Sequence, residues 1–227
     1  MIGSEYEDIL GDLPVRFFPQ SRLIMDRHDE HSNLYVVKSG RIKLKVLPSG
    51  GPGLTLQYLQ PGEQVGLLHR QDETTSVIAE AAVDSEVYLI RPERQSELAR
   101  QHPKWFFRGY RQMYRRMNDL WERYCRKNFY ELPTQVLCVL CRLAERFGTT
   151  GQEDIKLPDW LTIRDLADMT ASSPASVYRC MSDLREEGLV DTESTFRVTE
   201  VEGLRNHVAC HCGECPFQES SCASTKS

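Results

Sequence analysis

The sequence lacks several features that would place it in common classes of protein. It has no apolar run long enough to span a bilayer, and residues 1–8 contain neither a basic region nor an apolar stretch of signal-peptide length. We therefore expect a cytoplasmic protein that is not inserted in a membrane. With 40% hydrophobic and 27% charged residues, the chain also lacks the composition of a disordered or fibrous protein, and its 227 residues suit two small domains.

An excess of positive charge is also missing. The net charge is −5, and residues 153–207 hold 12 acidic but only 6 basic side chains. This balance counts modestly against nucleic-acid binding, because affinity depends on a local positive surface at the phosphates and not on the charge of the whole chain. Composition alone therefore leaves DNA binding open.

A catalytic constellation is absent from the sequence as well. An enzyme or electron carrier would need a substrate pocket with an acid, a base or a nucleophile, and none of the histidines stands at a catalytic spacing from a serine or cysteine. Surface or core positions explain His28, His31, His69 and His102 more simply. We expect a protein that is not an enzyme.

Eight cysteines are present, and a reducing compartment makes a disulfide framework a poor explanation for them. Four are scattered among expected helices, where cysteine behaves as a small hydrophobe: Cys125, Cys138, Cys141 and Cys180. The other four form a C-x-C-x2-C-x6-C array: Cys210, Cys212, Cys215 and Cys222. Because thiolates are soft ligands, this array predicts an iron–sulfur cluster or, alternatively, zinc. A metal-free tail and simple thiol redox chemistry are the remaining alternatives.

The hydrophobic pattern of residues 34–89 has a period of two. Residues 41–46 alternate strictly between basic and apolar side chains, which indicates a half-buried strand. Residues 34–37 precede it across a Lys38-Ser39-Gly40 turn, which predicts a hairpin. Further strands are expected at residues 54–58, 76–79 and 86–90. The first hundred residues therefore predict an antiparallel β-roll or barrel.

A heptad pattern follows Pro103. Its apolar positions are spaced four, three, four, three and four residues apart: Phe106, Tyr110, Met113, Met117, Leu120 and Tyr124. Such a seam requires a partner helix, so we expect a homodimer formed through it. The alternative is a helix packed on its own β domain, and Trp105 and Trp121, which lie off the seam, could make that second contact.

The C-terminal half contains the signals of a helix-turn-helix. After an apolar helix that ends before Gly148, Thr162 is a candidate N-cap for a short helix over residues 163–170. A three-residue break, Ala171-Ser172-Ser173, leads into Pro174, and Ser173 with Pro174 marks the start of a second helix that stops at Gly188. Residues 189–198 read as two short strands around a polar tip, a wing of the kind that usually touches phosphates. The second helix is the one expected to enter the major groove.

Residues 161–198 resemble the winged helix-turn-helix of the cyclic-AMP receptor protein and FNR family of transcription regulators. The resemblance extends to residues 34–46, to Pro61-Gly62-Glu63 and to the long heptad helix. It implies an α+β chain with a β-roll of the cyclic-nucleotide-binding type (1–100), a dimerisation helix (101–127), a winged helix-turn-helix (128–207) and a cysteine-rich tail (208–227). It also implies a homodimer that binds double-stranded DNA at a palindromic operator and acts together with RNA polymerase.

The resemblance also indicates which residues meet DNA: Ser172, Ser173, Ala175, Ser176, Tyr178 and Arg179. Arg179 would contact a guanine edge, and Ser172 or Ser173 a backbone phosphate. Family members commonly carry a glutamate where this chain has Ala175, so a different operator is expected. Ser176 and Tyr178 are then the further candidates for reading bases.

The β-roll lacks the residues with which the family binds a cyclic nucleotide. That ligand needs an arginine on its cyclic phosphate and a carboxylate on its ribose, but Leu67 and Thr75 stand at about those positions. Arg70 could reach the phosphate only from a different backbone position. We therefore expect no cyclic nucleotide. A regulator gated by a small apolar effector or by haem in the β-roll remains the alternative, with His69 as the candidate axial ligand.

The tail array resembles the C-terminal cluster of Bacillus-type FNR regulators, which bind a 4Fe-4S cluster. Those proteins use three cysteines and a distant aspartate, whereas this tail has the additional Cys210. The fourth ligand is therefore open between Cys210, His211 and Asp119. The resemblance implies a regulator that senses oxygen, nitric oxide or redox state through the tail.

Overall fold

The computed structural model describes residues 4–25, 33–48, 53–66, 75–150, 154–191 and 196–199. The chain divides into two compact units, residues 1–122 and 123–227, and the boundary falls within the long helix α3 (Pro103–Phe129). Among these residues, no helix combines the length and the apolar character needed to cross a membrane.

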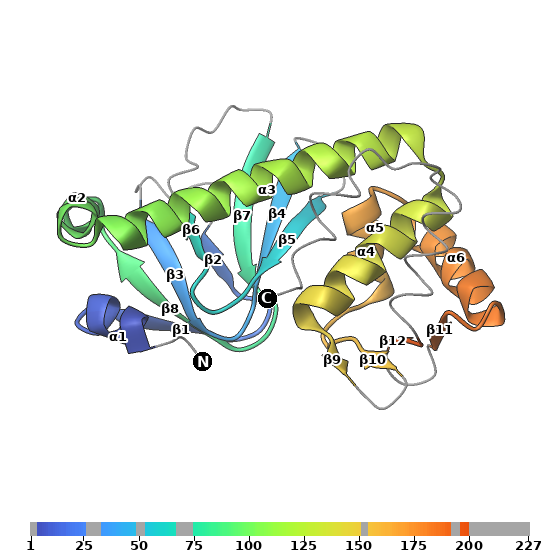
Figure 1. The fold of residues 1–227 in the computed structure, drawn as a ribbon, viewed down its shortest axis with the longest axis horizontal. Helices are drawn as coiled ribbons and strands as arrows, with labels where there is room; N and C mark the ends of the chain where they lie inside the picture. The colour runs from blue at the N-terminus through green and yellow to red at the C-terminus, as the bar shows by residue number, and fades with distance from the viewer. Residues whose placement is uncertain are drawn as a thin grey trace. The chain divides into compact units, whose positions relative to one another are not determined.

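The first unit is built on two four-stranded antiparallel sheets (Figure 1). One sheet has the order β1-β8-β3-β6, with bounds β1 (Val15–Phe18), β8 (Ser85–Ile90), β3 (Leu34–Ser39) and β6 (Gln64–Gly66). The other has the order β2-β7-β4-β5, with bounds β2 (Leu23–Met25), β7 (Thr75–Ala81), β4 (Ile42–Pro48) and β5 (Leu54–Leu59). The expected antiparallel β-roll is thus confirmed.

The core of the roll follows from the alternation in the sequence. In β4, Ile42 and Leu44 are buried, whereas Lys43 and Lys45 are only half-buried. The Lys45 ammonium lies 3.2 Å from the Glu80 carboxylate on the neighbouring strand β7. The strand therefore presents one face to the core and one face to polar neighbours, as the period of two predicts.

The expected hairpin over residues 34–46 is wrong, because β3 and β4 belong to different sheets. β3 pairs with β8 on one side and β6 on the other, so both of its edges are occupied, while β4 pairs with β5 and β7. The turn between them is real: Gly40 has φ +82°, and a side chain there would collide with Ser85. The Ser39-Gly40 signal therefore marks a crossing from one sheet to the other.

Three helices pack on the roll, and two of them, α1 (Ser4–Leu10) and α2 (Pro92–Gln101), were not expected from the sequence. Leu10 of α1, Leu98 of α2 and Trp105 of α3 form one buried cluster with Val36 of β3. Trp105 thus makes the predicted contact with the β domain. Trp121, the other candidate for such a contact, is 61% exposed.

The second unit contains the three expected helices and a small sheet. The helices are α4 (Leu132–Phe147), α5 (Ile163–Thr170) and α6 (Pro174–Glu186). The sheet has the order β11-β12-β10-β9, with bounds β11 (Val190–Asp191), β12 (Arg197–Val198), β10 (Ile155–Lys156) and β9 (Thr149–Thr150). The wing strands β11 and β12 were predicted, whereas β9 and β10 were missed.

Candidate functional site

Helix α5 begins where the sequence predicts. The Thr162 hydroxyl accepts a hydrogen bond from the Asp165 amide (3.2 Å), and the Asp165 carboxylate accepts one from the Thr162 amide (3.0 Å). This capping box satisfies two amides that the first turn of a helix leaves without partners. Leu166 and Ala167 are buried behind it, so the cap also fixes which face of α5 turns inward.

A tight turn joins α5 to α6. Ala171 adopts a left-handed conformation (φ 51°, ψ 47°), and its amide and that of Ser172 both donate to the Ala167 carbonyl. The Thr170 hydroxyl donates back to the Leu166 carbonyl at 2.8 Å, and the Ser172 hydroxyl donates to the Thr170 carbonyl at 3.1 Å. The turn is therefore held by its own hydrogen bonds.

Helix α6 starts at the predicted cap. The Ser173 hydroxyl accepts from the Ser176 amide at 3.1 Å, and Pro174 occupies the first turn, where its missing amide hydrogen costs nothing. The predicted inner stripe is confirmed, because Val177, Met181 and Leu184 are buried. Together α5 and α6 form a helix-turn-helix with a well-defined inner face.

The outer face of α6 carries most of the residues expected to meet DNA. Ala175, Tyr178 and Arg179 are exposed and lie three and four positions apart, which places them on one side of the helix. The Arg179 Nε donates to the Ala175 carbonyl at 3.4 Å. Ser172 and Ser176 are half-buried, and the Ser176 hydroxyl lies 2.8 Å from that of Ser173. The prominent groups on this face are therefore the arginine and the tyrosine.

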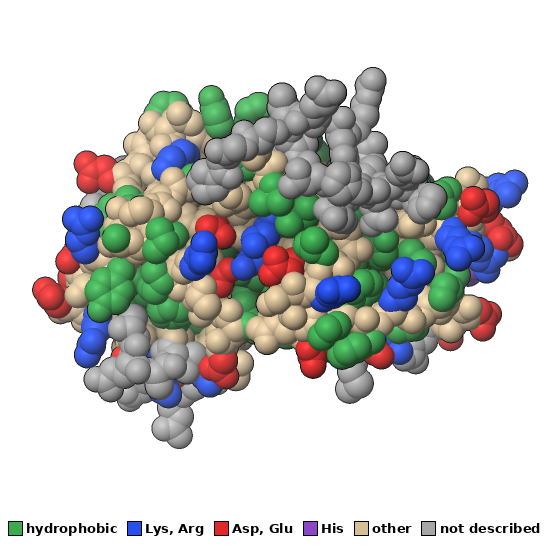
Figure 2. Space-filling model, turned by 180° about the vertical axis from the view of Figure 1, so that it is seen from behind, with side chains coloured by type: hydrophobic (Ala, Val, Ile, Leu, Met, Phe, Trp, Pro, Cys, Tyr) green, Lys and Arg blue, Asp and Glu red, His purple; other side chains and the backbone are tan. Residues whose placement is uncertain are grey.

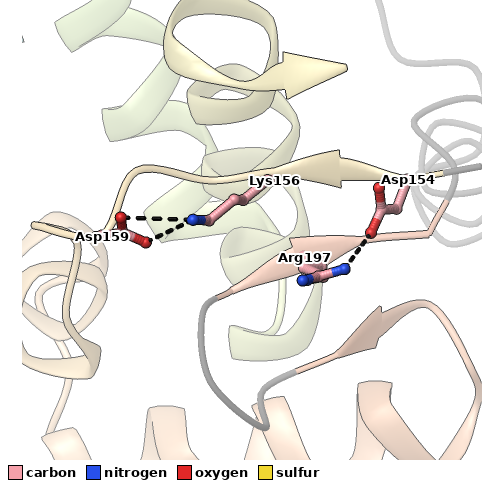
Figure 3. Close-up of polar contacts among 4 residues, drawn as sticks. All are labelled: Asp154, Lys156, Asp159 and Arg197. Carbon is pink, nitrogen blue, oxygen red and sulfur yellow. Dashed lines mark hydrogen bonds and ion pairs between the residues drawn. The ribbon is translucent and has the colours of Figure 1, made fainter. Parts of the chain in front are cut away.

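Two ion pairs lie in the small sheet (Figure 3). Arg197 of β12 lies 3.0 Å from the Asp154 carboxylate, and Lys156 of β10 lies 3.1 Å from that of Asp159. Exposed pairs of this kind contribute only about 0–1 kcal/mol to stability. Their consequence here is electrostatic, since each cation of these two strands is balanced by a nearby carboxylate. Residues 192–195 at the wing tip lie outside the described residues.

The apolar side chains of the predicted heptad seam on α3 are exposed to solvent in the single chain. Its six side chains are between 42% and 65% exposed: Phe106, Tyr110, Met113, Met117, Leu120 and Tyr124. On the face opposite to that of Figure 1, hydrophobic side chains lie at the surface among basic and acidic ones (Figure 2). Exposed large apolar side chains that recur at heptad spacing indicate a site of interaction.

A largely apolar cavity of about 320 Å³ lies between α3 and strands β4 to β6. Leu44, Leu56 and Gln57 line it from the sheet, and Phe106 and Met113 line it from α3. The Gln57 side chain is only 8% exposed, and its Nε2 has no hydrogen-bond partner among the described residues. An unsatisfied buried amide beside an apolar cavity is costly unless a further group completes it.

Several predicted residues lie outside the described part of the chain. They are Leu67, His69, Arg70, Cys210, His211, Cys212, Cys215 and Cys222. The side chain of Thr75, at the start of β7, is not described either. Asp119, the candidate distant ligand, lies on α3 beside the cavity. Within the described ranges, no group of three His, Cys, Asp or Glu side chains is placed to hold a metal ion.

The other four cysteines fit structural roles. Cys180 is buried in α6, and burial raises the pKa of its thiol, which therefore stays protonated and unreactive at neutral pH. Cys125, Cys138 and Cys141 are half-buried on α3 and α4. The expected role of Cys180 as a small core hydrophobe is thus confirmed.

Comparison with known proteins covers both units. Residues 15–102 match the cyclic nucleotide-binding domain, and residues 135–207 match the Crp-like helix-turn-helix domain. The chain is 25% identical over 230 residues to the anaerobic regulatory protein of Bacillus subtilis, covering 96% of this chain and 93% of that protein. It is 28% identical over 177 residues to the cyclic AMP receptor protein of Thermus thermophilus, covering 77% and 78%.

A solved structure of a CooA mutant from Carboxydothermus hydrogenoformans shares the fold. Its TM-score is 0.76 at 16% identity, with 91% of this chain and 92% of that chain covered. A β-roll of the cyclic-nucleotide-binding type, a long helix and a Crp-like helix-turn-helix therefore follow one another here in the same order as in these regulators. The protein belongs to the cyclic-AMP receptor protein and FNR family of transcription regulators.

Proposed function

We propose that this regulator is a homodimer that reads DNA with α6 and whose DNA binding responds to a metal centre held by the tail cysteines. The observation that carries the proposal is the outer face of α6, where Tyr178 and Arg179 project from a helix whose opposite stripe is buried. An exposed second helix of a helix-turn-helix is the element that enters the major groove.

Specific recognition is assigned to Arg179. A guanidinium donates two parallel hydrogen bonds to the O6 and N7 atoms of guanine, which no other base pair presents in the same way. Tyr178 and Ser176 are the further base-reading candidates, while Ser172 and Ser173 lie at the turn, where a phosphate would approach the start of α6. Ala175 offers no polar group, so its position in the operator is read through shape or a thymine methyl.

Replacing Arg179 by alanine is expected to weaken binding to the specific site by about 1–3 kcal/mol while retaining much of the nonspecific binding. The operator is obtained by selecting a duplex from a random library with the wild-type protein. Affinity is then measured on that duplex and on a scrambled duplex of the same composition.

Arg100→Ala is the matched control for this change. Arg100 is exposed on α2, so the substitution removes the same charge far from α6 in the sequence. The control should leave the ratio of specific to nonspecific affinity unchanged. Equal losses on both duplexes for Arg179→Ala would mean that the residue touches only the backbone.

Dimerisation through α3 follows from its seam. Six exposed apolar side chains at heptad spacing are what a second copy of the same helix would cover. A two-fold dimer places two α6 helices on DNA, so its operator is palindromic. RNA polymerase is the expected partner at the promoter.

The tail cysteines are proposed to hold a 4Fe-4S cluster, with zinc as the alternative. Four thiolates within 13 residues satisfy the ligand number and softness of either centre. The match to the anaerobic regulatory protein of B. subtilis, which covers 96% of this chain, supports a response to oxygen. An iron–sulfur cluster supplies a group that oxygen or nitric oxide attacks, which makes the tail a redox sensor.

A second candidate function rests on the cavity. Its volume of about 320 Å³ falls within the range of about 300–1,000 Å³ typical of small-molecule sites. The buried Gln57 amide supplies one donor in a largely apolar wall, which also includes Gln64, Arg116 and Asp119. These features suit an effector with an apolar body and one hydrogen-bond acceptor, and the regulator would then have a structural zinc or a metal-free tail. Haem is a further alternative, with His69 as its axial ligand.

The cavity is tested with the dye 1-anilinonaphthalene-8-sulfonate as a probe. Leu56→Trp adds bulk at the wall and should lower dye affinity about tenfold if the cavity is a binding site. Leu23→Trp, at an exposed position of β2, is the matched control. Effector gating requires that the bound dye also change the affinity for the selected duplex. Unchanged dye binding in the Leu56 variant removes this candidate.

A further inference from the structure

Two basic side chains from the end of α3 reach the end of α5. The Arg123 guanidinium donates to the Met169 carbonyl at 2.6 Å. The Lys127 ammonium donates to the Thr170 carbonyl at 3.3 Å and to the Ala171 carbonyl at 3.2 Å. Three successive carbonyls are thus bound by cations that come from more than forty positions earlier in the chain.

These contacts complete a helix end that the local sequence satisfies only in part. The last carbonyls of a helix lack internal partners and carry a partial negative charge, which cations stabilise. α5 has no basic residue in its own last turn, and it ends at Ala171 in a left-handed conformation that usually falls to glycine. Arg123 and Lys127 therefore supply the positive charge that the local sequence lacks, and they add hydrogen bonds to the one that Ser172 donates to the Thr170 carbonyl.

The location of the contact gives it a consequence for α6. Ala171 stands two residues before Ser173, the N-cap of the helix that carries Tyr178 and Arg179. Holding the carbonyls of the turn to α3 therefore fixes the point from which α6 starts. The contact lies wholly within the second unit, between the last turns of α3 and the turn that precedes α6.

We infer that Arg123 and Lys127 are positioning residues for DNA recognition, which set the placement of α6 by holding the turn between α5 and α6 to α3. The inference rests on the proposed reading of DNA by α6. Neither residue needs to touch DNA for this role. A displacement of about 1 Å in a recognition element is enough to weaken several base contacts at once, so loss of both cations should cost specific binding more than nonspecific binding.

The test compares the double variant Arg123→Gln/Lys127→Gln with Lys104→Gln/Arg115→Gln. The control removes the same two charges from exposed positions of the same helix. Affinity is measured on the wild-type-selected duplex and on its scrambled counterpart across a salt series. Relative to the control, we expect about a tenfold or larger loss on the selected duplex, a smaller loss on the scrambled one and an equal dependence on salt. Hydrogen exchange at the Ala171 and Ser172 amides should become faster.

Other results would overturn the inference. If the two residues bind phosphates instead, both duplexes lose affinity equally and the slope of log K against log salt falls by about 1.8, the contribution of two phosphate contacts. If the double variant matches the control in affinity and hydrogen exchange, the contact positions nothing. Arg123→Lys is the second variant. It keeps the positive charge and a hydrogen-bond donor for the Met169 carbonyl, so it should retain most of the wild-type affinity for the selected duplex. This variant tests the inference even if the double variant is unstable.

The proposed function and this inference fail separately. A wild-type protein that selects no duplex refutes DNA reading by α6, whatever the variants do. In that case the hydrogen-exchange comparison still decides whether Arg123 and Lys127 hold the turn.

Discussion

The Met117→Glu variant is expected to be a monomer with weak DNA binding. Met117 stands at the middle of the heptad seam, where two copies of α3 would bring the same position together across the two-fold axis. Two facing carboxylates without a partner cation cost about 3–5 kcal/mol, which corresponds to at least about a hundredfold loss of dimer affinity. A monomer reaches only one half-site, so operator binding should fall with dimerisation. Sedimentation equilibrium measures the first effect and operator titration the second.

Two features allow the effect on dimerisation to be separated from an effect on folding. Met117 is 48% exposed in the single chain, so a glutamate there is solvated in the monomer and should leave the fold of the subunit intact. Asn118→Glu provides the matched control, because it adds the same charge at the next, exposed position, which is off the seam. The control should remain dimeric. A Met117→Glu protein that sediments as a dimer would place the subunit interface elsewhere.

The helix-turn-helix could be predicted closely because its signals are local. Thr162, Ser173 with Pro174, and Gly188 each mark a helix end by their own hydrogen bonding or backbone preference, and all of them stand where the structure starts or ends a helix. The period of 3.6 residues then fixes which side of α6 is buried. The residues offered to DNA follow from these two facts without any knowledge of the rest of the fold.

Pairing in the β-roll could not be predicted in the same way, because it is non-local. The Ser39-Gly40 turn indicates that the chain changes direction, but β3 finds its partners in β6 and β8, which lie well beyond it in the sequence. A similar difficulty applies to β5, because a strand pattern alone does not show that the polar side chain of Gln57 is buried. α3 lies over this side of the strand at the cavity, and Gln57 is buried as a result.

The contact between α3 and the turn is also invisible in the sequence. Arg123 and Lys127 belong to a helix rich in basic residues, and nothing in the local pattern distinguishes them from Arg115, which is exposed. Only the packing of α5 beside the end of α3 brings them to the carbonyls of residues 169–171. Such tertiary caps replace a local glycine or lysine signal, and sequence patterns that search for the local signal miss them.

Serine substitution of three tail cysteines is expected to remove the bound metal and, with it, the response to oxygen. The three are Cys212, Cys215 and Cys222. A serine hydroxyl is a hard, weakly acidic ligand that does not replace a thiolate on iron or zinc. Binding a metal orders the segment between its ligands, and coupling of about 1–3 kcal/mol between that order and DNA binding corresponds to a change of about 5- to 150-fold in operator affinity. Iron, sulfide and zinc content of anaerobically purified protein, and operator affinity with and without oxygen, are the measurements.

The matched control removes the same number of thiols from the helices by serine substitution at Cys125, Cys138 and Cys141, which should leave metal content unchanged. Two single variants test Cys210 and Asp119 as the fourth ligand, and if neither variant loses metal, His211 is the remaining candidate. If the centre is completed locally, Cys210→Ser alone reduces the metal content and Asp119→Ala does not. If α3 supplies the ligand, as the Bacillus-type resemblance implies, Asp119→Ala reduces it and Cys210→Ser does not. Because Asp119 also lines the cavity, its variant is compared with the wild type in dye binding as well.

One outcome would exclude the tail as the sensor. In that outcome the triple-serine protein binds the operator with the same affinity as the anaerobic wild type, both with and without oxygen. The cavity beside Gln57 would then be the leading candidate for the regulatory site.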